Sequence, residues 1–186
     1  MACSEKRALK ESRTIVFCDQ SGFYLLPMVV RTYAPVGETP ILHENFTHDH
    51  LSVRSGITLE GKLYMIEQDR AFKGEDVVRF LGHLMHHVPG KLLVIWDGSP
   101  IHRSRAVKDF LASGASLRLQ LEQLPGYAPD LNPDEGIWKH LKCVGLKNLC
   151  CQSLAQLRVE LRKAKERLRH KKHVILRCIR QPGFEV

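Results

Sequence analysis

Short hydrophobic runs in the first part of the chain are typical of β-strands. The run TIVFC (14–18) is continuously apolar and stops at Asp19, which predicts a buried strand followed by a turn at DQSG. FYLLPMVVR (23–31) predicts a second strand, in which Pro27 marks an edge or a bulge. The sequence therefore opens with the pattern of one strand followed by antiparallel neighbours.

The next runs predict a hairpin and a helix. LSVRSGITL (51–59) and KLYMIEQ (62–68) flank Glu60-Gly61, a combination that predicts two strands joined by a tight turn. Apolar residues between 74 and 88 recur at helical spacing, and the Pro-Gly pair that follows ends this predicted helix.

A second strand and helix follow. KLLVIW (91–96) predicts another buried strand, and it too stops at an aspartate, Asp97. A short helix is predicted over 103–113, with Gly114 as the residue beyond its C-terminus. The alternating run SLRLQLEQL (116–124) predicts a strand that buries one face, at Leu117, Leu119 and Leu121.

A long helix is predicted from Ser153 to about Lys172. Its apolar residues form a seam for a partner helix or for the sheet: Leu154, Leu157, Leu161, Ala164 and Leu168. Basic residues lie on its other faces: Arg158, Arg162, Lys163, Lys165, Arg167, Arg169, Lys171 and Lys172. The order of elements predicts one α/β domain with a mixed sheet flanked by helices.

Composition adds an expectation about partners. The chain has 186 residues, enough for one domain with a sizeable core, and its 44% hydrophobic content is ordinary for a soluble protein. The formal net charge is +8. This excess predicts an anionic partner, with nucleic acid first and a membrane surface second, unless the chain is simply a basic soluble protein.

The sequence also bears on the compartment. No apolar run is long enough to span a bilayer, so no membrane partner is expected, and the N-terminus lacks the apolar centre of a signal peptide. The six cysteines show no CxxC pair. We therefore expect reduced thiols and a cytoplasmic protein.

Two groups of residues carry side chains that commonly bind metal ions. The motif HLMHH brings three histidines to helical spacing, and three cysteines lie near one another after a predicted helix: His83, His86, His87, Cys143, Cys150 and Cys151. Neither group has the spacing of a zinc site. We expect a histidine-rich helix flank and partly buried thiols.

Two buried strands each end in an aspartate. If the strands at 14–18 and 91–96 are parallel neighbours, Asp19 and Asp97 stand at the same edge of the sheet. Adjacent carboxylates repel unless a cation lies between them, and hard oxygen ligands suit Mg²⁺ or Mn²⁺. Each aspartate is also explained by a turn after a strand, where aspartate is common.

The segment LPGYAPDLNPDEGIWKHLK (124–142) leads through a proline-rich loop into a helix. Asn132 is the predicted N-cap, with proline at N1 and Glu135 at N3, an arrangement that stabilises a helix start without any further role. Pro125 and Pro129 stiffen the preceding loop. Such a loop fixes where the helix begins, as a metal-binding carboxylate would require.

Three motifs resemble one known family. LPGYAPDLNPDEGIWKHLK closely resembles the signature that closes the catalytic domain of the IS630/Tc1/mariner transposases. VIWDGSPIH resembles the second motif of that family, and VFCDQSGFYLLPMVVRTYAPVGETP resembles the first. They occur in family order over residues 14–142, and the likeness is greatest to the bacterial insertion-sequence branch, often called DDE superfamily endonucleases.

The resemblance implies an RNase H-like fold and a catalytic triad. The catalytic domain would span 14–150, between an N-terminal tail (1–13) and a C-terminal basic helix and tail (151–186). Carried over by motif, the triad and its metal ligands are Asp19, Asp97 and Glu135. Two Mg²⁺ ions, or Mn²⁺ as a substitute, would bind there.

The helix that carries Glu135 has further expected roles. Asn132 would cap it, and Trp138 would pack beneath it. Asp134 points about 100° away from Glu135 and is the less favoured ligand. His102 orients DNA or a catalytic carboxylate, or is a structural histidine.

The sequence departs from the family pattern at three points. Gln20 replaces the usual acidic residue after the first Asp, and Gly98 replaces the usual Asn after the second. The relatives carry helix-turn-helix DNA-binding modules before the catalytic strands, and this chain begins only a dozen residues ahead of them. We expect a catalytic half whose module is a separate subunit or the product of an upstream frame, or else a decayed copy.

The resemblance implies metal-dependent cleavage of DNA strands and strand transfer of an insertion sequence. The alternatives are an RNase H-like nuclease without integration activity and a remnant that binds DNA without catalysis. Because the chain lacks the helix-turn-helix module with which the relatives recognise DNA sequence, we expect its affinity for DNA to come from phosphate contacts of the basic helix. The residues expected to make these contacts are Arg158, Arg162, Lys163, Arg167 and Arg169. A homodimer is one further expectation.

Overall fold

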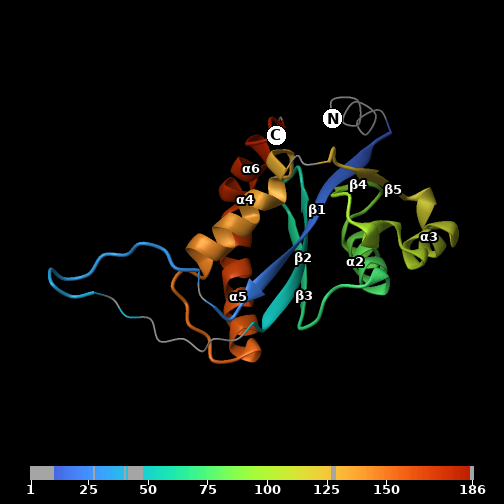
Figure 1. Ribbon diagram of the computed structural model, residues 1–186. Helices are drawn as coiled ribbons and strands as arrows, with labels where there is room; N and C mark the ends of the chain where they lie inside the picture. The colour runs from blue at the N-terminus through green and yellow to red at the C-terminus, as the bar shows by residue number, and fades with distance from the viewer. Residues whose placement is uncertain (1–10, 27, 40, 42–47, 127–128, 185–186) are drawn as a thin grey trace.

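A mixed five-stranded sheet runs through the computed structural model, in the order β3-β2-β1-β4-β5 (Figure 1). The strands are β1 (Arg13–Tyr24), β2 (His50–Thr58), β3 (Leu63–Gln68), β4 (Lys91–Trp96) and β5 (Leu119–Gln123). The structure describes residues 11–26, 28–39, 41, 48–126 and 129–184.

The sheet is antiparallel on one side of β1 and parallel on the other. β1 pairs antiparallel with β2, and β2 pairs antiparallel with β3. β1 pairs parallel with β4, and β4 with β5. Because Cys18 is opposite Trp96 in the parallel pair, Asp19 and Asp97 follow at adjacent positions of neighbouring strands.

Helices cover both faces of the sheet (Figure 1). One face carries α2 (Gly74–His87) and α3 (Arg105–Ala112), which follows a 3₁₀ turn at Pro100–Arg103. The other face carries α4 (Pro133–His140), α5 (Leu154–Arg169) and α6 (Lys172–Arg180). α4 begins after a 3₁₀ turn at Pro129–Leu131 and continues into a π-helical turn at Leu141–Gly145, and a 3₁₀ turn at Ala115–Leu117 precedes β5.

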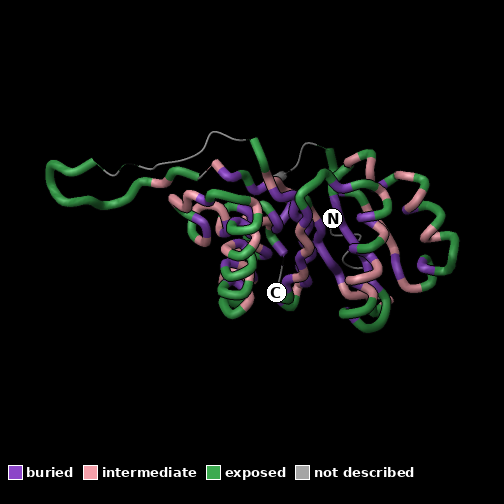
Figure 2. Tube along the Cα trace, turned by 90° about the horizontal axis from the view of Figure 1, so that it is seen from below, coloured by how far each residue is buried: buried purple, intermediate pink, exposed green. Residues whose placement is uncertain are grey.

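The alternation of side chains along β1 divides the core into two clusters. Ile15, Phe17 and Phe23 pack with α4, α5 and α6, whereas Val16 and Cys18 pack with α2. Figure 2 shows the buried residues concentrated along the strands and the helix faces turned toward them. Asp19 lies two residues after Phe17 on the same strand, so its side chain points to the same face of the sheet, which α4 covers.

Most predicted elements are confirmed. The hairpin turns at Gly61, where φ is +80°, a value that glycine tolerates and other residues rarely adopt. The helix at 74–88, the strand at 91–96 and the turn at Gly114, with φ of +109°, are also present.

The predicted turn at DQSG is wrong, because β1 continues through it to Tyr24. All nine residues from Val16 to Tyr24 pair with β2, and this ladder outweighs the local preference of the four turn residues. The strand predicted over 23–31 is wrong as well. Its first two residues belong to β1, residues 28–31 form no strand, and Pro27 lies outside the described residues.

Two boundaries near the C-terminal half also differ. Leu117 lies in the 3₁₀ turn before β5 and is 79% exposed, so the prediction that it is buried in a strand is wrong. The helix predicted over 153–172 is confirmed as α5, which ends at Arg169, and the chain then bends at His170 and Lys171 into α6, a helix that the sequence reasoning did not predict. The predicted seam is otherwise confirmed: Leu157, Leu161, Ala164 and Leu168 are buried against the sheet.

In the described part of the chain, no helix combines the length and the apolar character needed to cross a membrane. The segment that follows β1 leaves the body of the molecule as an extended arm (Figure 1). Its residues 28–39 are almost all exposed, including Tyr33 and Val36.

Candidate active site

Asp19 lies in the middle of β1, beneath α4. The Trp138 indole Nε1–H donates to its Oδ2 at 2.9 Å, which joins two residues far apart in the sequence. Burial raises the pKa of the Asp19 carboxyl, and the Trp138 hydrogen bond opposes this shift. Trp138 therefore packs as predicted and also orients the first aspartate.

Asp97 follows β4 directly and is about half-exposed. The ring of His102 reaches back to it, with Nδ1 3.0 Å from Asp97 Oδ1, and the Ser99 backbone N–H donates to the same oxygen at 3.2 Å. These contacts lower the pKa of Asp97 below its ordinary value, and the hydrogen bond from His102 makes the largest contribution. Asp97 is therefore ready to act as a carboxylate at neutral pH.

His102 is buried, with only 7% of its surface exposed. Its ring stacks on Trp96, with the ring centroids 4.1 Å apart and the planes 7° from parallel. Of the roles expected for His102, this buried position favours orienting Asp97 over contacting DNA directly.

The start of α4 brings two carboxylates close to Asp19. Asn132 caps the helix as predicted, accepting a hydrogen bond from the backbone N–H of Asp134 at 3.2 Å. Glu135 is exposed and lines a cavity of about 240 Å³ between the helix entrance and the end of α6. The cap therefore fixes the turn from which Glu135 projects.

Asp134 is fully buried, a position that the sequence reasoning did not anticipate. The Ser55 hydroxyl of β2 donates to its Oδ1, while Oδ2 has no hydrogen-bond partner among the described residues. Burial, followed by the negative charge of Asp19, raises its pKa well above the ordinary range. The only signal that the sequence offered was an aspartate at N2, the second residue of the predicted helix.

The charges of the three predicted triad residues act on one another. After burial, the negative charges of Glu135 and Asp97 also raise the pKa of Asp19, which means that they oppose the ionisation of that carboxyl. A divalent cation would relieve this repulsion, and carboxylate oxygens are the ligands that Mg²⁺ and Mn²⁺ prefer. The donor chemistry therefore fits such an ion.

The carboxylates are more open than a complete metal cage. Across the residues that the structure describes, no three His, Cys, Asp or Glu side chains gather closely enough to hold a metal by themselves. Mg²⁺ in enzymes that act on phosphates commonly keeps several waters and takes one or two carboxylates together with substrate oxygens. The open arrangement is compatible with that mode of binding.

Lys142 is a further cation at this site that the sequence reasoning missed. Its Nζ donates to the Ser21 hydroxyl at 2.8 Å and lies 5.3 Å from the centre of the Phe23 ring. Burial lowers the pKa of Lys142, while the charges of Glu135 and Asp19 raise it. Its position seven residues after Glu135, two helical turns on, was the available signal.

The basic side chains of α5 make contacts within the molecule. Arg162 Nε lies 2.5 Å from Glu67 Oε1 at the sheet edge, and Arg158 lies 4.0 Å from Asp69. Lys163 pairs with Glu160 of its own helix. Further along α5, Lys165 lies 3.8 Å from Glu166, and two arginines donate to backbone carbonyls: Arg167 to Gly145 and Arg169 to Leu63.

The histidine group on α2 packs against an aromatic ring. The rings of His83 and His87 lie 4.2 Å apart, and both approach Tyr64. The described cysteines are free thiols, of which Cys18 and Cys151 are buried.

The contact between α4 and α6 is tight at Gly136. A Cβ there would lie 2.8 Å from Cys178 Sγ and 3.0 Å from Cys178 Cβ. Gly136→Ala is therefore expected to lower the free energy of unfolding by about 1–2 kcal/mol, since overpacking outweighs the gain in helix propensity. Chemical denaturation would measure this loss.

Gly82 provides the matched control. It lies within α2, and a Cβ there would meet nothing within 4 Å. Gly82→Ala should raise the free energy of unfolding by about 0.5–1 kcal/mol. Equal effects of the two substitutions would contradict the described packing of α4 on α6.

Comparisons with known proteins identify a family and a similar fold. The model of the DDE superfamily endonuclease family matches residues 14–158. Among solved structures, the chain is similar to the Mos1 mariner paired end complex with Mn, at 18% identity and a TM-score of 0.69 over 97% of this chain and 56% of that one. No curated protein matches the sequence.

Two other solved structures show the same likeness. The mariner Mos1 paired end complex with Mg matches at 19% identity and a TM-score of 0.63, over 99% of this chain and 59% of that one. The catalytic domain of Mos1 mariner transposase matches at 15% identity and a TM-score of 0.59, over 100% and 91%. The chain thus spans less than two thirds of the longer Mos1 chains and nearly the whole of the catalytic domain.

Proposed function

Because this chain belongs to the DDE superfamily endonucleases, we propose that it cleaves DNA strands and transfers the freed 3′ ends of an insertion sequence to target DNA. Its mixed sheet flanked by helices is the RNase H-like fold of the DDE transposase catalytic domains. The observation that carries the proposal is the pair Asp19 and Asp97, at adjacent positions of parallel strands, with the charge of Glu135 acting on Asp19.

Asp19, Asp97 and Glu135 are the residues that would hold divalent metal ions. The proposal is supported by the effect of the Glu135 and Asp97 charges on Asp19 and by the likeness to Mos1 complexes with Mn and with Mg. Bound metal ions supply an activated water and stabilise the departing 3′ oxygen of a phosphodiester.

The surrounding residues of the chain keep the carboxylates in place. Trp138 fixes one oxygen of Asp19, and His102 fixes one oxygen of Asp97. Asn132 caps the helix that carries Glu135. Lys142 places a positive charge near Asp19 and Glu135, where a DNA phosphate would enter.

DNA is the proposed partner, because the similar Mos1 structures are paired-end and strand-transfer complexes. A homodimer and a helix-turn-helix DNA-binding subunit are further proposals as partners.

Cleavage and joining assays test the proposed function. Purified protein with Mg²⁺ or Mn²⁺ should nick supercoiled DNA, and a pre-cleaved labelled end should become covalently joined to a target plasmid. Nicking without joined products would favour an RNase H-like nuclease. DNA binding with neither product would favour a non-catalytic remnant.

DNA affinity should depend on salt and scarcely on sequence. If about four of the eight Lys and Arg side chains between residues 158 and 172 reach phosphates, log K should fall with log salt at a slope of roughly −3 to −4. Replacing Arg162, Lys163, Arg167 and Arg169 together by Gln should flatten this slope. Titration of labelled duplexes of unrelated sequence would measure it.

A pair of α3 residues on the opposite face of the sheet provides the control. Arg105→Gln with Lys108→Gln removes exposed charge there and should change the slope less. An unchanged slope in the α5 variant, or a thousandfold preference for one duplex, would contradict this proposal for DNA binding.

A further inference from the structure

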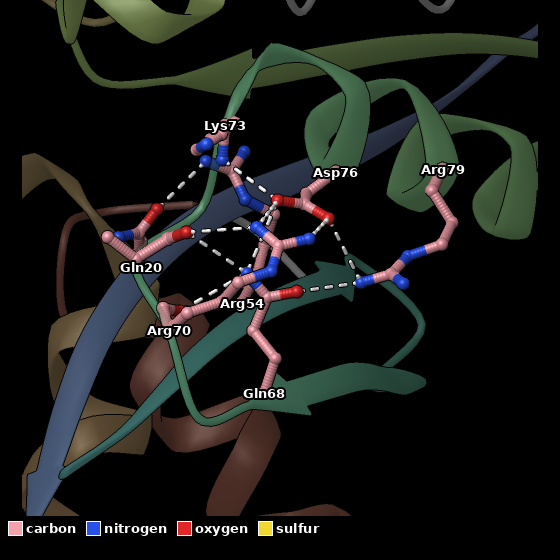
Figure 3. Close-up of polar contacts among 8 residues, drawn as sticks. Gln20, Arg54, Gln68, Arg70, Lys73, Asp76 and Arg79 are labelled. Carbon is pink, nitrogen blue, oxygen red and sulfur yellow. Dashed lines mark hydrogen bonds and ion pairs between the residues drawn. The ribbon is translucent and has the colours of Figure 1, made fainter.

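Arg54 of β2 is buried beneath α2, with only 1% of its surface exposed. Its Nη2 donates to Gln20 Oε1 at 3.1 Å, and its guanidinium lies over the Phe72 ring, 5.5 Å from the ring centre. Figure 3 shows Arg54 beside Gln20, close to the network that Asp76 makes with Arg70 and Arg79. Arg54 thus connects β1 with the entrance of α2.

The charge of Arg54 is unusual for so buried a group. Within the described parts of the chain, no carboxylate lies within 4.0 Å of its nitrogens, and its Nε has no hydrogen-bond partner. Burying an unpaired charge costs several kcal/mol. More distant carboxylates, including Asp97 and Asp19, provide the opposing charge. Fold stability alone would be served better by an apolar side chain.

The contacts of Arg54 determine where the proton of His102 lies. Both Nη1 and Nη2 stand 3.3 Å from His102 Nε2. A guanidinium can only donate hydrogen bonds, so Nε2 must accept and carries no proton. With Nε2 accepting, the ring proton lies on Nδ1, which is 3.0 Å from both the carboxylate Oδ1 and the backbone oxygen of Asp97.

We propose that Arg54 is a positioning residue for Asp97, acting through His102. Its two donors hold the imidazole as the Nδ1–H tautomer, and Nδ1–H in turn fixes the orientation of the Asp97 carboxylate. The role of Asp97 itself rests on the proposed function above. Trp96 completes the arrangement by stacking on the buried ring, which favours this orientation of the imidazole.

Nitrogen NMR of the histidine rings tests the tautomer without metal or DNA. In protein labelled with ¹⁵N-histidine, His102 should show a protonated Nδ1 and an unprotonated, hydrogen-bonded Nε2. His102→Gln identifies its signals among those of the ten histidines. A proton on Nε2 of the wild-type ring would overturn the proposal, whatever the nuclease assays show.

Calorimetric titration with Mn²⁺ tests the action on Asp97. Arg54→Met should weaken Mn²⁺ affinity about tenfold, and His102→Ala tenfold or more, as is typical when the partners of a metal-binding carboxylate are removed. The double variant should bind no more weakly than His102→Ala alone. Fully additive losses would mean that Arg54 acts by another route and would overturn the proposal.

Two further variants separate positioning from a general loss of structure. Arg118→Met removes a half-buried arginine that holds the carbonyls of Gly90, Met85 and Val88 at the other end of the sheet. It should leave both the His102 signals and Mn²⁺ affinity unchanged. Should Arg54→Met not fold, Arg54→Lys keeps the charge without the two-donor fork and should give a smaller loss of Mn²⁺ affinity.

These readouts are independent of catalysis. A protein that shows the tautomer and the non-additive Mn²⁺ effect but never cleaves DNA would contradict the proposed function and support the role of Arg54. A protein that cleaves DNA with His102 in the other tautomer would do the reverse.

Discussion

Asp97→Asn is expected to lower metal-dependent DNA cleavage by roughly 10³-fold, because several kcal/mol of transition-state stabilisation by metal are lost with the carboxylate. Glu135→Gln should have a comparable effect. Both side chains are substantially exposed, so neither change should disturb the fold. Rates of plasmid nicking, with melting curves to verify folding, would measure the result.

Asp109→Asn is the matched control for these substitutions. This aspartate is exposed on α3, where it lies 3.6 Å from Arg105. It should leave the nicking rate within about twofold of wild type, as expected for a surface change. Equal nicking by wild type and Asp97→Asn would exclude Asp97 from the catalytic site.

Asp134→Asn is expected to remove part of a pH dependence of stability. The pKa of Asp134 is raised well above its ordinary value of 3.8 by burial first and by Asp19 second. As the pH rises above that value, the unfolded chain releases a proton that the folded chain keeps. The folded state then binds more protons, so the free energy of unfolding falls until the raised pKa is passed.

The asparagine has nearly the shape of the neutral acid and can accept the Ser55 hydrogen bond. The variant should therefore match wild type near pH 4 and be the more stable of the two at pH 8, in metal-free buffer. Urea denaturation across this range would measure the difference. Asp109→Asn should show no such divergence, and a constant difference at every pH would contradict the assignment of a proton to Asp134.

Much of the site was predictable because its motifs carry local signals. The strand before Asp97 is a continuous apolar run, and the Asn132 cap follows from residue preferences at helix starts. The parallel pairing that brings Asp19 beside Asp97 follows from the rule for strands separated by a helix.

The parts that could not be predicted depend on contacts between distant segments. The turn expected after Asp19 is overridden by pairing with β2, which no local pattern reveals. Trp138 meets Asp19 across 119 residues, and Arg54 meets His102 across 48. Such contacts are set by the packing of α4 and α2 on opposite faces of the sheet.

The bend between α5 and α6 has the same origin. Lys171 adopts a non-helical conformation, with φ of −103° and ψ of 57°. The bend lets Ile175 and Ile179 of α6 enter the core beside α4, so the packing of α6 sets where α5 ends, a few residues before the predicted end near Lys172.

The central claim is that Asp19, Asp97 and Glu135 together hold the catalytic metal ions. Diffraction from crystals soaked in Mn²⁺, recorded at the manganese absorption edge, tests it most directly. The account predicts anomalous density within about 2.1 Å of carboxylate oxygens from Asp19 and Asp97, with Glu135 turned toward the same ions. Manganese bound only elsewhere, such as at His83 and His87, with the three carboxylates left without an ion at saturating Mn²⁺, would contradict it.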